Sequence, residues 1–150
     1  MATQTQAQSQ TQTSTDKAKV LRWALLANVF FSAMSGIEFI LFPSIDANFF
    51  GFEGNRILGL MNGDMFLRST GVDLLIWAAI VWFVSSRPTI NIKHVYAIIA
   101  LDMVWVLGTV AILLTDALTL STNGSWVLLA KGDVVLTLAV LQYWGIRRMR

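Results

Sequence analysis

The sequence predicts an all-α integral membrane protein, an antiparallel four-helix bundle, and three observations carry this prediction. The 150 residues are 55% hydrophobic and only 13% charged, which is typical of chains surrounded by lipid rather than water. Four apolar segments are each long enough to cross a hydrocarbon core of ~30 Å as a helix that rises ~1.5 Å per residue. Basic residues, in addition, gather at one end of the expected helices.

Residues 1–18 precede the first apolar segment and consist chiefly of Gln, Thr, Ala and Ser. A stretch with so few apolar side chains cannot bury enough surface to offset the entropy lost on ordering, so we expect a disordered tail. The tail lacks the basic and then apolar start of a cleaved signal peptide, and we expect it to stay on the protein. Residues 19–150 are expected to form the transmembrane domain.

The predicted spans of this domain cover residues 20–42, 56–84, 92–115 and 125–146. Pro43 ends the first span, because proline cannot continue a helix. In the loop that follows, Phe49, Phe50 and Phe52 are expected to lie at the membrane interface.

In a four-span protein, the two termini and the loop between the second and third spans lie on the same side of the membrane. Eight basic residues fall on this side, whereas only Arg56 belongs to the loops on the opposite side. The eight are Lys17, Lys19, Arg22, Arg87, Lys93, Arg147, Arg148 and Arg150. Loops rich in Lys and Arg stay in the cytoplasm, so both termini are expected there in a multi-pass topology.

Six charged residues lie deep within the predicted spans: Glu38, Arg68, Asp73, Asp102, Lys131 and Asp133. Counting residues from the basic ends places the three aspartates at one level near the middle of the bilayer, and the other three somewhat nearer the outside. A charge that faces lipid at a helix centre costs at least ~2.5 kcal/mol, so we expect the six side chains to face one another, or water, inside the bundle.

Lys131 and Asp133 stand about 200° apart on a helix, so they cannot both point inward. One of them is expected to face a neighbouring helix or an edge of the bundle, which could also be an oligomer contact. Gly132 between them lets another helix approach, and Ser32-x-x-x-Gly36 and Gly59-x-x-x-Gly63 have the small-residue spacing that serves the same purpose.

Four further residues are candidates for the wall of a pocket beside the charged cluster: Asn62, Asp64, Trp77 and Trp105. Asp64 and Arg68 form an i, i+4 pair that could compensate locally. Trp77 and Trp105 stand one turn from an aspartate each, where they would wall a ligand cavity, cage a cation or pack in the core.

The six deep charges comprise four acids and two bases, an imbalance that a low-dielectric interior disfavours. Protonated acids, a bound cation or a cationic ligand would relieve it. Two interpretations stay open at this point. The charges either fix the register of the bundle through hydrogen bonds and ion pairs, or they form a site that handles protons, ions or a ligand.

Several kinds of site are excluded by composition. The chain has no cysteine, which rules out disulfides and thiolate chemistry, and its single histidine, His94, cannot pair with a second one on a transition metal or haem. We predict no catalytic residue, no metal site and no cofactor. The net charge of +2 and the absence of a nucleic-acid-reading motif exclude DNA and RNA as expected partners.

The stretches "LANVFFSAMSGIEFILFPSIDANFFGF", "ALDMVWVLGTVAILL" and "VLQYWGIRR" resemble small bacterial four-helix membrane proteins, similar in layout to the DoxX-like superfamily. The resemblance covers most of residues 21–150 and implies a place in the bacterial cytoplasmic (inner) membrane. Some DoxX-like proteins are associated with respiratory quinone chemistry, but the family offers no catalytic motif to carry over. Lys131 and Asp133 stand where the family has apolar residues.

The leading hypothesis is a non-enzymatic membrane protein, either an accessory subunit or a module that responds to protons or a small ligand. Asp73, Asp102 and Asp133 would accept protons or cations, with Arg68 and Lys131 as their counter-charges. The alternatives are a small oligomeric carrier coupled to protons or cations, and a membrane enzyme acting with a quinone or another lipid-soluble substrate. The expected partners are the lipid bilayer and either further copies of the chain or a larger membrane complex.

Overall fold

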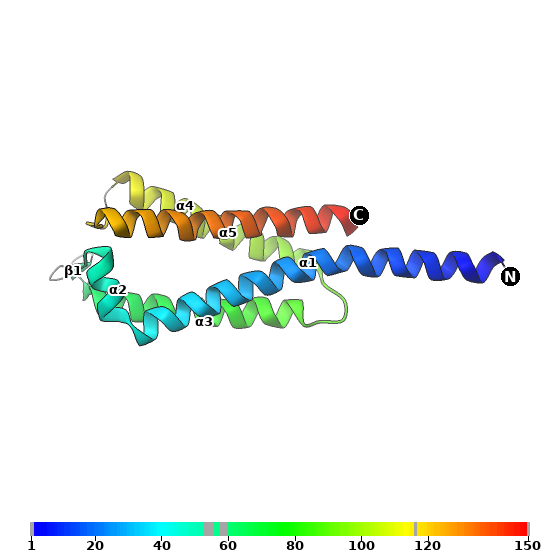
Figure 1. Cartoon of the computed structure of the whole chain (residues 1–150), viewed down its shortest axis with the longest axis horizontal. Helices are drawn as coiled ribbons and strands as arrows, with labels where there is room; N and C mark the ends of the chain where they lie inside the picture. The colour runs from blue at the N-terminus through cyan, green and yellow to red at the C-terminus, as the bar shows by residue number, and fades with distance from the viewer. Residues whose placement is uncertain (1, 53–55, 58–59, 116, 150) are drawn as a thin grey trace.

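The computed structural model describes residues 2–52, 56–57, 60–115 and 117–149, and it has the predicted architecture of four long helices (Figure 1). These helices are α1 (Ala2–Leu41), α3 (Gly63–Ser85), α4 (Ile92–Thr115) and α5 (Thr122–Met149). A short helix, α2 (Pro43–Phe50), and a hairpin of β1 (Arg56–Ile57) and β2 (Met61–Asn62) lie at one end of the bundle, which we call the hairpin end. The prediction of an antiparallel four-helix bundle is confirmed.

Among the described residues, four helical segments are long and apolar enough to cross a membrane. They are Lys19–Leu41, Gly63–Ser85, Ile92–Thr115 and Thr122–Met149. The predicted start of the second span at residue 56 is wrong, because Arg56 and Ile57 pair with Asn62 and Met61 in the hairpin. Asn62 then caps α3, since its side-chain oxygen accepts a 2.9 Å hydrogen bond from the Met65 amide.

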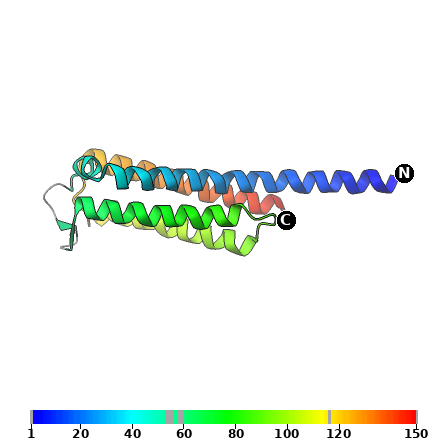
Figure 2. The same ribbon diagram turned by 90° about the horizontal axis from the view of Figure 1, so that it is seen from below.

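The first residues of the chain differ from the prediction of a disordered tail. Helix α1 already begins at Ala2 and projects beyond the bundle (Figures 1 and 2). Burial is not needed to extend an existing helix, because each added residue costs far less than nucleation, and Ala, Gln and Lys all favour helix.

The long helices follow the order α3, α1, α5, α4 around the bundle. Helix α1 packs closely against α3 and α5, and α4 packs against α5, whereas α3 and α4 make few contacts. Figure 1 shows α4 diverging from α3 with distance from the loop that joins them. The side of the bundle between α3 and α4 is therefore the least closed.

Glycines allow α1 and α3 to cross closely. A Cβ atom at Gly36 would lie 2.8 Å from the Gly71 carbonyl oxygen, and one at Gly71 would lie 2.8 Å from the Gly36 carbonyl oxygen. The predicted role of Gly36 in helix approach is thus confirmed, with α3 as its partner. Gly132 likewise packs on the Thr109 side chain of α4, and Gly59 lies outside the described residues.

Buried side chains form two clusters, one toward each end of the bundle. The cluster toward the termini contains Leu21, Leu25, Val81, Val95, Ile98 and Ile146. The cluster at the hairpin end contains Phe39, Ala47, Phe50, Phe52, Ile57 and Leu67. Phe50 and Phe52, which the sequence places at the membrane interface, are buried within the protein, because α2 folds back over the bundle and the left-handed Gly51 turns the chain inward.

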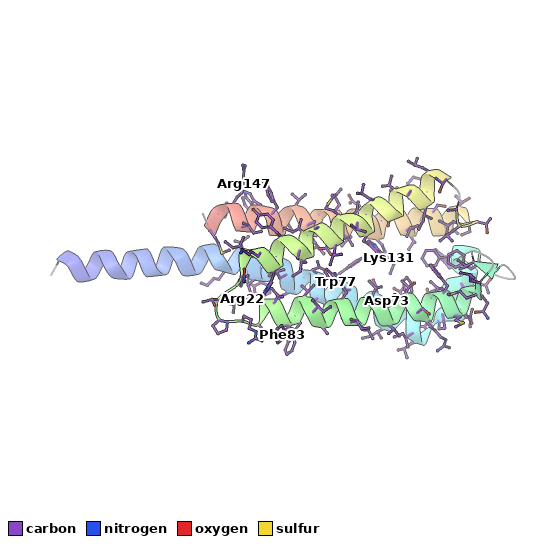
Figure 3. All side chains as sticks on the ribbon, turned by 180° about the vertical axis from the view of Figure 1, so that it is seen from behind. Arg22, Asp73, Trp77, Phe83, Lys131 and Arg147 are labelled. Atoms are coloured by element: carbon purple, nitrogen blue, oxygen red, sulfur yellow. The ribbon has the colours of Figure 1, made fainter. Side chains whose placement is uncertain are left out.

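The end opposite the hairpin carries the basic residues, and we call it the basic end. Lys19, Arg22, Arg87, Lys93, Arg147 and Arg148 lie here, and Figure 3 labels Arg22 and Arg147. One Arg22 nitrogen donates hydrogen bonds to the carbonyl oxygens of Arg87, at 2.8 Å, and Pro88, at 3.3 Å. These bonds fasten the α3–α4 loop to α1.

Candidate ligand cavity

Asp102 of α4 is the centre of a buried hydrogen-bond network. Its Oδ2 accepts a 2.6 Å bond from Asn28 Nδ2 and a 3.3 Å bond from Gln142 Nε2, and its Oδ1 accepts a 3.2 Å bond from Trp77 Nε1. The side chain is only 3% exposed. The three donors come from α1, α5 and α3, so this one carboxylate ties all four long helices together.

The network continues along α1, where Asn28, Ser32 and Ser35 recur at helical spacing and are all buried. The Ser32 hydroxyl donates to Asn28 Oδ1 at 3.2 Å, which fixes the amide so that its nitrogen faces Asp102. Gln142 is fully buried, and its Oε1 has no hydrogen-bond partner among the described residues. Helix α1 thus presents a narrow polar stripe to the interior of the bundle.

A cavity of about 590 Å³ lies between this network and the phenylalanine cluster at the hairpin end. Its walls are mainly apolar and include the rings of Phe31, Phe39, Phe50, Phe52 and Phe66. Its polar lining residues are Asn28, Ser32, Ser35, Thr70, Asp73, Asp102, Thr109 and Lys131. Apolar walls of this size with a few polar groups are typical of sites for small lipophilic molecules.

The cavity opens between α3 and α4. Five of its lining residues are exposed, and all five belong to these two helices: Asp73, Leu101, Val104, Trp105 and Gly108. The lining residues from α1, α2 and α5 are buried or partly buried. A Cβ atom placed on Gly108 would meet no atom within 4 Å, so this glycine borders open space.

Lys131 lies on the inner side of α5, as Figure 3 shows. Of the two charges Lys131 and Asp133, it is therefore Lys131 that points into the bundle. Its Nζ donates to Glu38 Oε2 at 2.9 Å and to Ser35 Oγ at 3.1 Å, and lies 4.7 Å from the centre of the Phe39 ring. Asp133, on the other side of α5, is exposed and makes no hydrogen bond or ion pair with the described residues.

Asp46 of α2 joins this group at the hairpin end. Burial, and secondarily the negative charge of Glu38, raises the pKa of the Asp46 carboxyl above its usual value, while Lys131 partly lowers it. Its Oδ2 is buried and has no partner among the described residues. Glu38, Asp46 and Lys131 therefore combine two acids with one base.

The remaining predicted site residues are divided between the cavity and the surface of the bundle. Arg68 is exposed and donates to the Ile40 carbonyl oxygen at 3.3 Å, while Asp64 accepts a 2.5 Å bond from the Ser44 hydroxyl, so these two charges do not pair as expected. Asn62 serves as the cap of α3. Trp77 and Trp105 both line the cavity, as does Asp73. The structure does not gather the six deep charges into one cluster.

Three residues of this region were missed by the sequence reasoning: Asn28, Gln142 and Asp46. Asn28 and Gln142 are uncharged polar residues within apolar spans, "LANVFF" and "AVLQYW", where a polar side chain usually has a partner on another helix. This signal can be read from the sequence, but the prediction considered only charged residues within the spans. Among the described residues, no group of three or more His, Asp or Glu side chains could hold a metal ion.

Comparison with models of known protein families gives no match, and neither the curated proteins nor the solved structures contain a match to this chain. The resemblance to the DoxX-like superfamily therefore stays a prediction from the sequence.

Proposed function

We propose that this chain is a multi-pass membrane protein, with both termini in the cytoplasm, that binds a small lipid-soluble molecule without transforming it. The four apolar helices support a place in the bilayer, and the basic end supports the orientation. By the resemblance noted above, the membrane is the bacterial cytoplasmic membrane. The protein would act as a ligand-responsive module, alone or as an accessory subunit.

The observation that carries this proposal is the cavity of about 590 Å³ with apolar walls and a fixed polar floor. Such walls bury the hydrocarbon part of a ligand, and a few placed polar groups orient it. Its opening lies beside the exposed apolar side chains of Leu101 and Val104, so a molecule dissolved in the bilayer could enter sideways.

Binding fits the polar groups better than catalysis does. Both oxygens of Asp102 already accept hydrogen bonds from protein donors, so taking a proton from a ligand would require breaking this network. Lys131 is likewise held by Glu38 and Ser35. The residues that remain available at the cavity suit recognition.

A neutral fluorescent probe, N-phenyl-1-naphthylamine, tests the proposal on the full chain in lipid nanodiscs, with empty nanodiscs subtracted as background. We expect saturable binding with energy transfer from tryptophan, since Trp77 and Trp105 line the cavity. Gly108→Phe should weaken this binding about tenfold, which is about 1.4 kcal/mol, because its ring enters the opening. The matched control is Leu114→Phe, on the same helix but 80% exposed and away from the cavity.

Equal binding by both variants, or no signal beyond that of empty nanodiscs, would contradict the proposal. Flux of a proton or cation across liposomes that depends on the protein would instead favour the carrier. The carrier needs access from both membrane faces, whereas the buried cluster of Leu21, Leu25 and Ile146 fills the bundle toward the basic end.

A further inference from the structure

The charges that face the cavity are unevenly balanced. Lys131 is the cation among the lining residues, and its ammonium is already bound to the Glu38 carboxylate. The two carboxylates that line the cavity are those of Asp73 and Asp102, and neither has a cationic partner among the described residues. The net charge presented to a ligand is therefore negative.

Asp73 is the carboxylate that remains available. Asp102 accepts three hydrogen bonds, whereas Asp73 makes no hydrogen bond or ion pair with the described part of the chain. It lies eleven residues into α3, a helix of 23 apolar-rich residues, and it borders the cavity opening. An ionised carboxylate in such surroundings is costly unless a positive charge lies beside it.

Trp105 and Asp73 belong to the two helices that border the opening, and the helical register gives their relative heights. The bond between Trp77 and Asp102 fixes the relative height of α3 and α4. Asp73 lies one turn from Trp77, about 6 Å toward the hairpin end, and Trp105 lies about 4.5 Å from Asp102 in the same direction. Asp73 and Trp105 are thus at similar heights on the two sides of the opening.

Aromatic rings at the cavity are suited to positive charge. Trp77 and Trp105 both line it, and the face of an indole ring attracts a cation more strongly than other aromatic rings do. The protein already uses such a contact, because the Lys131 ammonium lies 4.7 Å from the centre of the Phe39 ring in the same cavity. The available carboxylate and the two indoles together have the chemistry that suits an organic cation.

We propose that the cavity ligand is an amphipathic organic cation whose charged group lies between Asp73 and Trp105, with its hydrocarbon part among the phenylalanine rings. This inference rests on the proposed function and names the ligand class of the same cavity. Such a ligand enters from the bilayer between α3 and α4, neutralises Asp73 and leaves the Asp102 network intact. A small inorganic ion would leave most of the apolar volume unfilled.

Tetraphenylphosphonium and tetraphenylborate test this inference, because the two ions match closely in size and shape but carry opposite charge. Their binding to the full chain in nanodiscs is measured by equilibrium dialysis, with empty nanodiscs subtracted. We expect tetraphenylphosphonium to bind saturably and at least tenfold more tightly than tetraphenylborate. Asp73→Asn should remove about tenfold of that affinity and weaken the binding of neutral N-phenyl-1-naphthylamine much less.

The matched control is Asp133→Asn, which removes an aspartate from a similar depth on α5, away from the cavity. It should bind tetraphenylphosphonium like the wild type, and a thermal unfolding scan of each variant confirms folding. Tighter binding of tetraphenylborate, or an Asp73→Asn variant that retains full affinity for tetraphenylphosphonium, would overturn the inference. Saturable binding of the neutral probe would still uphold the proposed function. If none of the three probes binds, both proposals fail.

Discussion

Asn28 donates a 2.6 Å hydrogen bond to Asp102, although α1 and α4 lie diagonally across the bundle and their backbones do not approach each other. Two side chains therefore bridge a distance that helix packing leaves open. The bond forms the floor of the cavity and joins the helix pair α1–α3 to the pair α4–α5. Removing this bond should therefore weaken the link between α1 and α4.

The first prediction concerns this floor. Asp102→Leu leaves the donors of Asn28, Trp77 and Gln142 without an acceptor, and each such loss costs about 1–3 kcal/mol. We expect a marked fall in the unfolding temperature in detergent, measured by tryptophan fluorescence. The unfolding temperature of Asp102→Asn should fall less, because the amide oxygen of the new side chain can still accept a hydrogen bond. Asp133→Asn is the control and should unfold like the wild type; an equal loss in that variant would argue against the network as the cause.

The second prediction concerns the crossing of α1 and α3. Gly71→Ala brings a methyl group to 2.8 Å from the Gly36 carbonyl oxygen and from Ile40, so the helices must separate. Overpacking of this kind costs about 1–3 kcal/mol. Gly108→Ala makes the same chemical change where the added Cβ meets nothing, and alanine favours helix over glycine. Chemical unfolding should show Gly71→Ala destabilised and Gly108→Ala unchanged or slightly stabilised, and the reverse order would refute the close crossing.

The third prediction concerns the ion pair of Lys131 with Glu38. The Glu38 side chain is 48% exposed and that of Lys131 20%, so the protein shields the pair only in part. A double-mutant cycle with Glu38→Gln and Lys131→Gln should give a coupling energy of about 1 kcal/mol or less. A coupling several times larger would show that the pair is shielded more fully, as by lipid or a second copy of the chain.

The fourth prediction concerns pH and Asp46. Its raised pKa means that, between the usual value and the raised one, the folded state binds more protons than the unfolded state. Stability contributed by this group is therefore lost as the pH rises through that window, and the penalty is complete above it. Asp46→Asn should unfold at a higher temperature than the wild type at neutral pH. The two proteins should converge in acid, so a difference that persists below pH 4 would contradict this cause.

The sequence predicted the helices well because their signals are local. Apolar length set the four spans, Pro43 marked the end of α1, and the distribution of Lys and Arg marked one end of the bundle. The hairpin of Arg56–Ile57 with Met61–Asn62 escaped prediction because apolar residues continue across it. Its boundary depends on the capping geometry of Asn62, which hydropathy does not register.

The site was less predictable because residue depth does not fix helix rotation. Asp73, Asp102 and Asp133 were expected at one level, yet one borders the opening, one is buried and one is exposed on the far side of α5. Rotation follows from contacts such as that of Gly36 with Gly71, which pair residues distant in sequence. Those pairings require the helix order, and a single sequence does not contain it in readable form.

The α3–α4 loop, which Arg22 fastens to α1, determines how α4 could move relative to α3. We call this loop the strap. Residues 86–91 join α3 to α4 at the basic end, and hydrogen bonds from Arg22 anchor them there. Because α3 and α4 are joined at the basic end, a small rotation of α4 about this loop would move the hairpin end of α4 furthest. Tilting α4 about this strap would change the width at Gly108 more than at Asp102, because Asp102 lies nearer the pivot. Such a tilt would widen or narrow the opening at Gly108 while it leaves the hydrogen bonds of Asp102 nearly unchanged.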